Sequence, residues 1–151
     1  MPTSFSNLSS LEELDARAWR ISGEIPDDFE KLSALEIVKL DSNDFSKLPS
    51  SLRGLSLLKK LQLPQCEKLV SLPPLPSSLE ELNLANCISL ESISDLSNLK
   101  SLQELNLTNC EKLVDIPGLE SLKSLRRLYM SNCNTCSSAA KKRLSKVGFF
   151  I

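Results

Sequence analysis

Aliphatic residues recur along this chain in the arrangement Leu-x-x-Leu-x-Leu, with conservative replacements at single positions. Six segments carry the pattern: residues 11–16, 35–40, 58–63, 79–84, 102–107 and 125–130. Their first residues are 24, 23, 21, 23 and 23 positions apart. In each segment the fourth and sixth residues are apolar and their neighbours are mostly polar, as in a strand with one buried face. The pattern therefore predicts six short strands, one in each repeat.

The spacing of these strands predicts how they pack. Repeats of 20–29 residues with this leucine pattern are leucine-rich repeats. A single repeat cannot bury its apolar side, whereas stacked repeats pair their strands over a continuous core. We expect an α/β fold: a right-handed leucine-rich-repeat solenoid, shaped as a short horseshoe, with a parallel sheet on its concave face. The solenoid is predicted to form one domain over residues 1–151, with about six repeats between residues 11 and 136.

A second pattern lies three residues after the last apolar position of each segment. Trp19 occupies this position in the first repeat, and small polar or thiol side chains occupy it afterwards. We predict that these later residues form a structural turn ladder, consisting of Asn43, Cys66, Cys87, Cys110 and Cys133. The chain turns inward there, and an amide or a small thiol can pair with backbone groups that leave the strand. Trp19 breaks the series, which predicts an irregular first turn.

The segments between the strands repeat as well. Proline follows an aliphatic residue at residues 25–26, 48–49, 72–73 and 116–117. Because proline has no N–H, these segments predict an irregular or 3-10 helical convex side without strand pairing.

The two ends of the chain differ from each other. Residues 1–11 match residues 25–35 position by position, so we expect the chain to open within a repeat, without an N-terminal cap, as a fragment or a shortened paralogue of a longer array. Residues 137–147 depart from the repeat and predict a C-terminal capping helix within residues 137–151, with Ser137 or Ser138 as N-cap. The apolar residues 148–151 either fold under this cap or mark a truncation.

Composition narrows the function. The chain has no histidine, the commonest general acid/base and metal ligand. Its net charge is −1, which gives no field for nucleic acid. No apolar run approaches the roughly 18 residues of a membrane span, and no signal peptide is visible. The five cysteines are an odd number, which favours free thiols. We expect a non-catalytic protein without cofactor, metal, nucleic-acid or membrane partner, located in the cytoplasm or shared between cytoplasm and nucleus.

Two local motifs have alternative interpretations. Cys133 and Cys136 form a Cys-x-x-Cys pair, but a zinc or redox site needs further ligands or a low-pKa thiol, and Cys133 already belongs to the turn ladder. Lys141, Lys142, Arg143 and Lys146 form a basic cluster that fits a nuclear signal, a phosphate patch or, as we favour, the solvated face of the cap helix.

The turn motifs resemble a known family. Residues 61–82 combine Leu-x-x-Cys-x-x-Leu with Leu-Pro-x-Leu-Pro-x-Ser-Leu, and the cysteine turn recurs at residues 86–90 and 109–113. These motifs resemble the C-terminal repeats of plant TIR-type nucleotide-binding leucine-rich-repeat disease-resistance proteins. The resemblance implies a part in sensing pathogen effectors and in restraining the receptor. No phosphate-binding loop or TIR segment is present in the chain, so nucleotide binding and NAD cleavage are not implied.

Two other classes share parts of this pattern. Residues 21–26 are similar to the Gly-x-Ile-Pro element of secreted plant inhibitors of microbial pectinases, which carry a signal peptide and cysteine-paired caps. Residues 72–79 resemble bacterial effector repeats, which run near 20 residues throughout. The alternative function is therefore that of a secreted inhibitor-type leucine-rich-repeat protein acting on a microbial enzyme. For the favoured resemblance the expected partner is a protein: a pathogen effector, a guarded host protein or the rest of a parent receptor.

The outward positions of the strands are the candidate binding site. In such solenoids the concave sheet face, lined by parallel columns of side chains, is the usual binding surface. The candidates are Ile37, Lys39, Lys60, Gln62, Glu81, Asn83, Glu104, Asn106, Arg127 and Tyr129. Tyr129 and Arg127 are the strongest, since these residue types dominate interface hot spots, and Ile37 is an apolar residue in an outward column. An ordinary solvated sheet face is the alternative.

Overall fold

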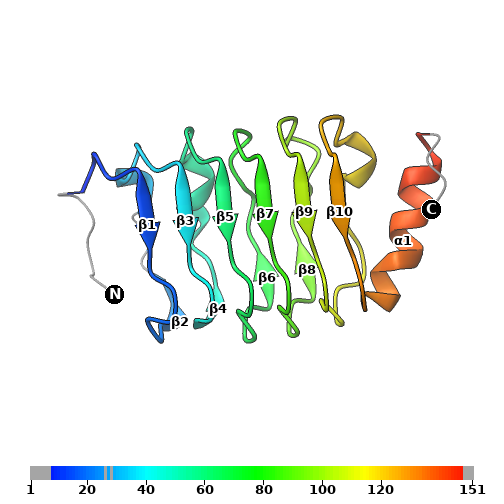
Figure 1. Cartoon of the computed structure of the whole chain (residues 1–151), viewed down its shortest axis with the longest axis horizontal. Coiled ribbons are helices and arrows are strands. Elements are labelled where there is room, and N and C mark those ends of the chain that lie inside the picture. The colour runs from blue at the N-terminus through cyan, green and yellow to red at the C-terminus, as the bar shows by residue number, and fades with distance from the viewer. Residues whose placement is uncertain (1–7, 26, 28, 148–151) are drawn as a thin grey trace.

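Six parallel strands form the main sheet of the molecule. The computed structural model describes residues 8–25, 27 and 29–147. The strands are β1 (Glu13–Asp15), β3 (Ile37–Lys39), β5 (Lys60–Gln62), β7 (Glu81–Asn83), β9 (Glu104–Asn106) and β10 (Arg127–Tyr129). They lie side by side in chain order, one from each repeat (Figure 1). The predicted leucine-rich-repeat solenoid with a parallel sheet is confirmed.

The core lies directly behind this sheet and consists almost wholly of leucine. The middle residue of each strand points inward, and Val38, Leu61 and Leu105 are fully buried. Apolar residues of the returning segments, such as Phe29 and Phe45, close the core from the other side. Because each repeat contributes the same positions, the core is a continuous column rather than a single cluster.

Among the described residues, the returning side carries three 3-10 helices and four very short strands. The helices are η1 (Phe29–Lys31), η2 (Ser50–Gly54) and η3 (Leu119–Ser121), as predicted. The strands are β2 (Ser22–Glu24), β4 (Asp44–Lys47), β6 (Ser71–Leu72) and β8 (Ser92–Ile93), which pair as β2–β4 and β6–β8. The prediction that this side has no strand pairing is therefore wrong. β6 ends immediately before Pro73, which has no N–H to donate, and β2 and β4 likewise end before an aliphatic-proline pair.

The C-terminal helix α1 (Asn134–Ser145) lies at the far end of the solenoid (Figure 1). It begins three residues before Ser137, so the prediction of Ser137 or Ser138 as N-cap is wrong. The N-cap is Cys133, whose side chain makes no capping bond. Ser137 lies inside the helix, and its hydroxyl donates to the Cys133 carbonyl at 2.8 Å. The helix can start this early because Cys136, Ala140 and Leu144 recur every four residues and bury one face.

The expectations for the chain ends concern residues 1–7 and 148–151, which lie outside the described residues. Among the helices that the structure describes, none has the length and apolarity to cross a membrane.

Candidate functional site

The register of the sheet places the predicted site residues on one exposed face. Pairing aligns two columns: Glu13, Ile37, Lys60, Glu81, Glu104 and Arg127, then Asp15, Lys39, Gln62, Asn83, Asn106 and Tyr129. Adjacent strands are about 4.8 Å apart, so each column is a continuous row of side chains. We call these two columns the concave face. All ten candidates belong to it, and Tyr129 is 45% exposed.

Ion pairs cross the concave face between neighbouring strands. Lys39 Nζ lies 3.6 Å from Glu13 Oε2, and Arg127 Nη1 lies 3.4 Å from Glu104 Oε1. Lys60 Nζ lies 3.9 Å from Glu81 Oε2. Exposed pairs of this kind contribute little to folding. Their charges can therefore be redirected towards a partner at low cost.

Two of the ten candidates have a role in the fold. The side-chain oxygens of Asn83 and Asn106 accept hydrogen bonds from the N–H groups of Ala85 and Thr108, each at 3.0 Å. Each asparagine thus holds the turn that follows its own strand. Ile37, Arg127 and Tyr129 stay the candidates that the sequence favours for contact with a partner.

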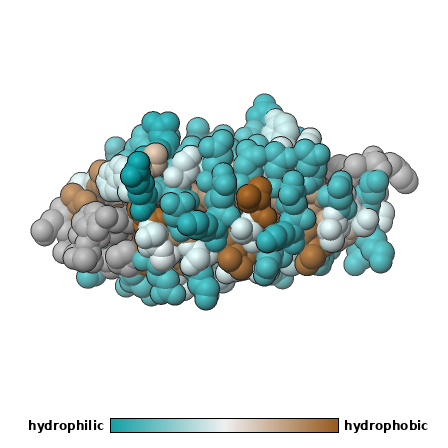
Figure 2. All heavy atoms as spheres, turned by 90° about the horizontal axis from the view of Figure 1, so that it is seen from below, coloured by the Kyte–Doolittle hydropathy of each residue, from teal (hydrophilic) through white to brown (hydrophobic). Residues whose placement is uncertain are grey.

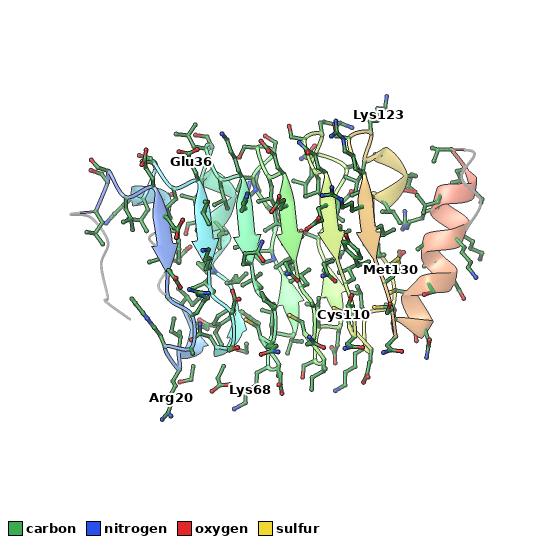
Figure 3. The ribbon with its side chains drawn as sticks, viewed as in Figure 1. Arg20, Glu36, Lys68, Cys110, Lys123 and Met130 are labelled. Atoms are coloured by element: carbon green, nitrogen blue, oxygen red, sulfur yellow. The ribbon has the colours of Figure 1, made fainter. Side chains whose placement is uncertain are left out.

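A shallow hollow surrounds Ile37. It has a volume of about 290 Å³, and its lining also includes Glu12, Glu36 and Lys59, which the strand columns did not predict. Glu36 lies at the upper end of β3 and pairs with Lys59 at 3.4 Å (Figure 3). These residues share the second position of the Leu-x-x-Leu-x-Leu pattern, so the repeat itself carries the signal that they are neighbours.

The turn ladder links each repeat to the one before it. Every ladder side chain donates to the carbonyl of the last apolar residue in the preceding repeat. The bonds are Asn43 Nδ2 to Ala16 O at 2.9 Å, Cys66 Sγ to Leu40 O at 3.3 Å, Cys87 Sγ to Leu63 O at 3.2 Å, Cys110 Sγ to Leu84 O at 3.1 Å, and Cys133 Sγ to Leu107 O. The predicted ladder thus satisfies backbone groups as expected.

Trp19 has no such carbonyl to satisfy, because it lies in the first repeat of the described chain. Its side chain is half exposed. Arg20, the residue after it, has a left-handed backbone conformation with φ of 59°, whereas the residues after the later ladder positions do not. The turn at Trp19 is irregular, as the break in the ladder predicted.

A second series runs beside the turn ladder, and the sequence analysis missed it. The residue before each ladder position has a φ between 58° and 62°: Ser42, Gln65, Asn86, Asn109 and Asn132. The last three stack through their side chains, with Asn109 donating to Asn86 at 2.5 Å and Asn132 to Asn109 at 2.7 Å. Asparagine tolerates this conformation better than most residues. The Asn-Cys dipeptide, which occurs three times in the sequence, is the feature from which this series could have been predicted.

All five cysteines are buried free thiols. Burial raises the pKa of Cys66 to about 11 and that of Cys87 to about 12. Both side chains are therefore neutral thiols that donate hydrogen bonds. Cys136 lies close to Cys133, with its Sγ 3.5 Å from the Cys133 carbonyl. In the part of the chain that the structure describes, no three potential metal ligands come together.

This burial predicts slow thiol chemistry. In the native protein at pH 8 we expect Cys66 and Cys87 not to react with a disulfide reagent within minutes, since the raised pKa of each leaves little thiolate. After unfolding in guanidinium chloride all five should react. Spectrophotometric thiol titration measures both states. Rapid native reaction of Cys66 or Cys87 would contradict the buried ladder.

Arg143 departs from the prediction for the basic cluster. Its guanidinium forms a bidentate pair with Asp115, at 2.9 and 2.7 Å, and a second pair with Glu120, at 3.0 and 2.9 Å. Lys141, Lys142 and Lys146 are exposed. The favoured interpretation as a solvated face thus fits the three lysines and is wrong for Arg143, which anchors α1 to residues 115–120 of the repeat before the last. Hydrogen bonding to Arg143 lowers the pKa of Asp115.

Arg143→Ala should therefore loosen the cap helix. We expect amide exchange in residues 134–145 to accelerate about three- to tenfold at pH 7, because a partly exposed bidentate pair is lost. The lowered pKa of Asp115 means that the pair stabilises the fold above the ordinary carboxyl pKa of 3.8 and that this contribution fades as the pH falls below it. Lys142→Ala, on the same helix, is the control for exchange measured by mass spectrometry. Equal exchange in both variants would refute the anchoring role.

Comparison with known proteins agrees with this geometry. The family descriptions "Leucine Rich Repeat" and "Leucine Rich repeats (2 copies)" match residues 10–32 and residues 77–120 and 100–141. The chain belongs to the leucine-rich-repeat proteins. Among these, its repeats are similar to plant disease-resistance proteins, which confirms the resemblance seen in the turn motifs.

Two such relatives illustrate the similarity. The chain is 37% identical to TMV resistance protein N of Nicotiana glutinosa over 93 residues, which are 61% of this chain and 8% of the relative. It is 46% identical to the disease resistance-like protein DSC2 of Arabidopsis thaliana over 52 residues, 34% of this chain and 4% of the relative. The chain thus spans less than a tenth of the length of these relatives.

Among solved structures, the leucine-rich-repeat domain of the type III effector XopL aligns with 86% of this chain and 72% of its own. The TM-score is 0.46 and the identity 19%.

Proposed function

We propose that this chain is a non-catalytic recognition module that binds a protein through its concave face. The observation that carries the proposal is the register, which aligns the outward side chains of six strands into two exposed columns. Leucine-rich-repeat solenoids typically serve as protein-interaction scaffolds, because such columns offer a partner one long surface. Ile37, Arg127 and Tyr129 are the proposed anchors.

The similarity to plant resistance proteins supports a more specific role. We propose that the module acts in the cytoplasm as the effector-sensing or autoregulatory repeat region of a TIR-type intracellular immune receptor, or as a shortened paralogue of one. Its partner is then a pathogen effector, a guarded host protein or another part of a receptor. The mixed charges of the concave face favour a protein surface over a uniformly charged polymer.

Quantitative co-precipitation from plant extract tests the proposal. The variant Ile37→Ala/Arg127→Ala/Tyr129→Ala should lose at least about tenfold of the captured partner, as expected when hot-spot residues are truncated. The matched control is Val70→Ala/Lys68→Ala/Val114→Ala, three exposed residues away from the concave face. Circular dichroism verifies that both variants are folded. If the two variants capture the partner equally well, the concave face is not the binding surface.

A further inference from the structure

The solenoid is incompletely closed at its C-terminal end. Leu125, Leu128 and Met130 are only half buried, whereas the equivalent Leu102, Leu105 and Leu107 of the preceding repeat are 2% exposed or less. A groove of about 320 Å³ lies there, between the last repeat and α1. Its apolar lining consists of Leu119, Leu122, Leu125, Leu128, Met130, Leu144 and Val147. Met130 lies beside β10 in the gap that faces α1 (Figure 3).

The backbone beside this groove is an open strand edge. In earlier repeats the N–H at the Met130 position donates to the next strand, as Leu84 does to Asn106 at 2.8 Å and Leu107 to Tyr129 at 2.7 Å. The N–H at the Asn132 position does the same, as Asn109 does to Ser131 at 2.8 Å. Within residues 8–147, excluding 26 and 28, no backbone acceptor is found for the N–H of Met130 or Asn132. This edge therefore presents ladder donors beside an apolar groove.

The charges beside the groove select the occupant. Arg126 and Arg127 both line it and are exposed. Arg127 occupies the same column as Lys60, which is paired in register with Glu81 of the next strand. No ion pair of Arg126 is found in the described chain. A strand added to β10 thus meets two cations at the places where the segment Leu79–Leu84 carries Glu80 and Glu81.

From these observations we infer a second interaction surface, which adjoins the concave face and shares Arg127 with it. We propose that the groove binds an extended segment of a partner protein, which pairs with β10 as a parallel strand and inserts its apolar side chains between the last repeat and α1. The segment has the form Leu-Glu-Glu-Leu-x-Leu. Residues 79–84 of this chain have the same form, and their strand β7 pairs with the preceding strand β5 in the parallel arrangement proposed here. Leu144 and Val147 of the cap wall the groove on its far side, so it admits a single strand rather than a complete repeat.

Other exposed apolar residues offer no comparable surface. Val70, Ile88 and Val114 are exposed on the returning side and the turns, but the edge seen from below is mostly hydrophilic with isolated hydrophobic residues (Figure 2). Scattered residues of this kind are normal on a soluble surface.

A labelled peptide with the sequence of residues 78–85, Ser-Leu-Glu-Glu-Leu-Asn-Leu-Ala, tests the proposal by fluorescence anisotropy with the full chain. We expect saturable binding with a Kd below about 1 mM. N-methylation of alternate backbone amides should weaken it at least about tenfold, because strand pairing is blocked. Arg126→Glu should weaken binding about two- to fivefold and should favour a peptide with lysines in place of both glutamates. Lys68→Glu, on the lower edge (Figure 3), should change nothing.

Four results would overturn the proposal. The first two are no binding at about 1 mM peptide and equal binding of the N-methylated peptide. The third is tighter peptide binding by Phe149→Ser/Phe150→Ser, which would assign the groove to the chain's own end. The fourth is self-association, measured by sedimentation velocity, that the peptide reverses, because a second copy would then be the occupant. Ile37→Ala, on β3, should leave peptide binding unchanged whether or not the concave face binds its own partner.

Discussion

Gly118→Ala is expected to lower the free energy of unfolding by about 3–5 kcal/mol, through backbone strain and a steric clash together. Gly118 has a φ of 86°, and a Cβ atom there would lie 2.5 Å from the backbone nitrogen of Ser97 and 2.9 Å from that of Leu96. Leu96 is fully buried, and its N–H donates to the Pro117 carbonyl at 2.8 Å. The two repeats would have to separate to admit a methyl group. Urea denaturation followed by circular dichroism measures the loss.

Gly23 provides a matched control for this prediction. Its φ is 74°, but no atom lies within 4 Å of the position that a Cβ would take. Gly23→Ala should therefore cost only about 1 kcal/mol, the price of a left-handed conformation. If both variants lose the same stability, the close approach of residues 96 and 97 to Gly118 is not what requires glycine.

Asn43→Ala is expected to lower the free energy of unfolding by about 3 kcal/mol, because two buried backbone groups lose their partners. Asn43 is 1% exposed and is the buried polar residue of the described core. Its amide donates to Ala16 O and Leu40 O, both at 2.9 Å, and its carbonyl oxygen accepts from Ile21 N at 3.0 Å. Alanine would leave the Ala16 carbonyl and the Ile21 N–H unpaired.

Two further substitutions test whether the loss of stability in Asn43→Ala comes from the unpaired backbone groups. Urea denaturation followed by circular dichroism measures all three variants. Asn43→Cys should lose only about 1–2 kcal/mol, since a thiol can donate to Ala16 O as the other ladder cysteines do, while the Ile21 N–H stays unpaired. Asn98→Ala, at an exposed surface position, should stay within about 0.5 kcal/mol of the parent. A small loss in Asn43→Ala, comparable to that of Asn98→Ala, would show that water replaces the amide.

The strand positions were predictable because one periodicity determines them. The alternation within each Leu-x-x-Leu-x-Leu segment predicted both outward columns, and the register pairs Glu13 with Ile37 and Arg127 with Glu104 accordingly. The turn ladder was predictable for a related reason. A small side chain that can donate a hydrogen bond suits the position three residues after the last apolar residue of a segment, and Cys66 and Cys110 meet both conditions.

The remaining features depend on contacts that no local pattern expresses. Ser42 and Gln65 adopt left-handed conformations because their turns require them, although neither residue type indicates it. The four short strands of the returning side pair because stacking brings them together. The helix α1 starts early because its buried face is set by packing on η3, which a capping preference alone does not reveal. The groove at β10 likewise depends on where α1 lies.

The turn ladder has a direction, and this gives the solenoid a polarity. Each ladder donor belongs to one repeat and each acceptor to the repeat before it. During synthesis, the acceptor carbonyl for each new ladder donor is therefore already present in the preceding repeat. The new repeat supplies the missing hydrogen bond to that carbonyl as it folds. Loss of a repeat from the front leaves an unpaired thiol, a weak donor that tolerates an apolar environment. Loss from the back deprives a buried carbonyl of a partner. An array built on cysteine turns should thus vary in length more freely at its front than at its back.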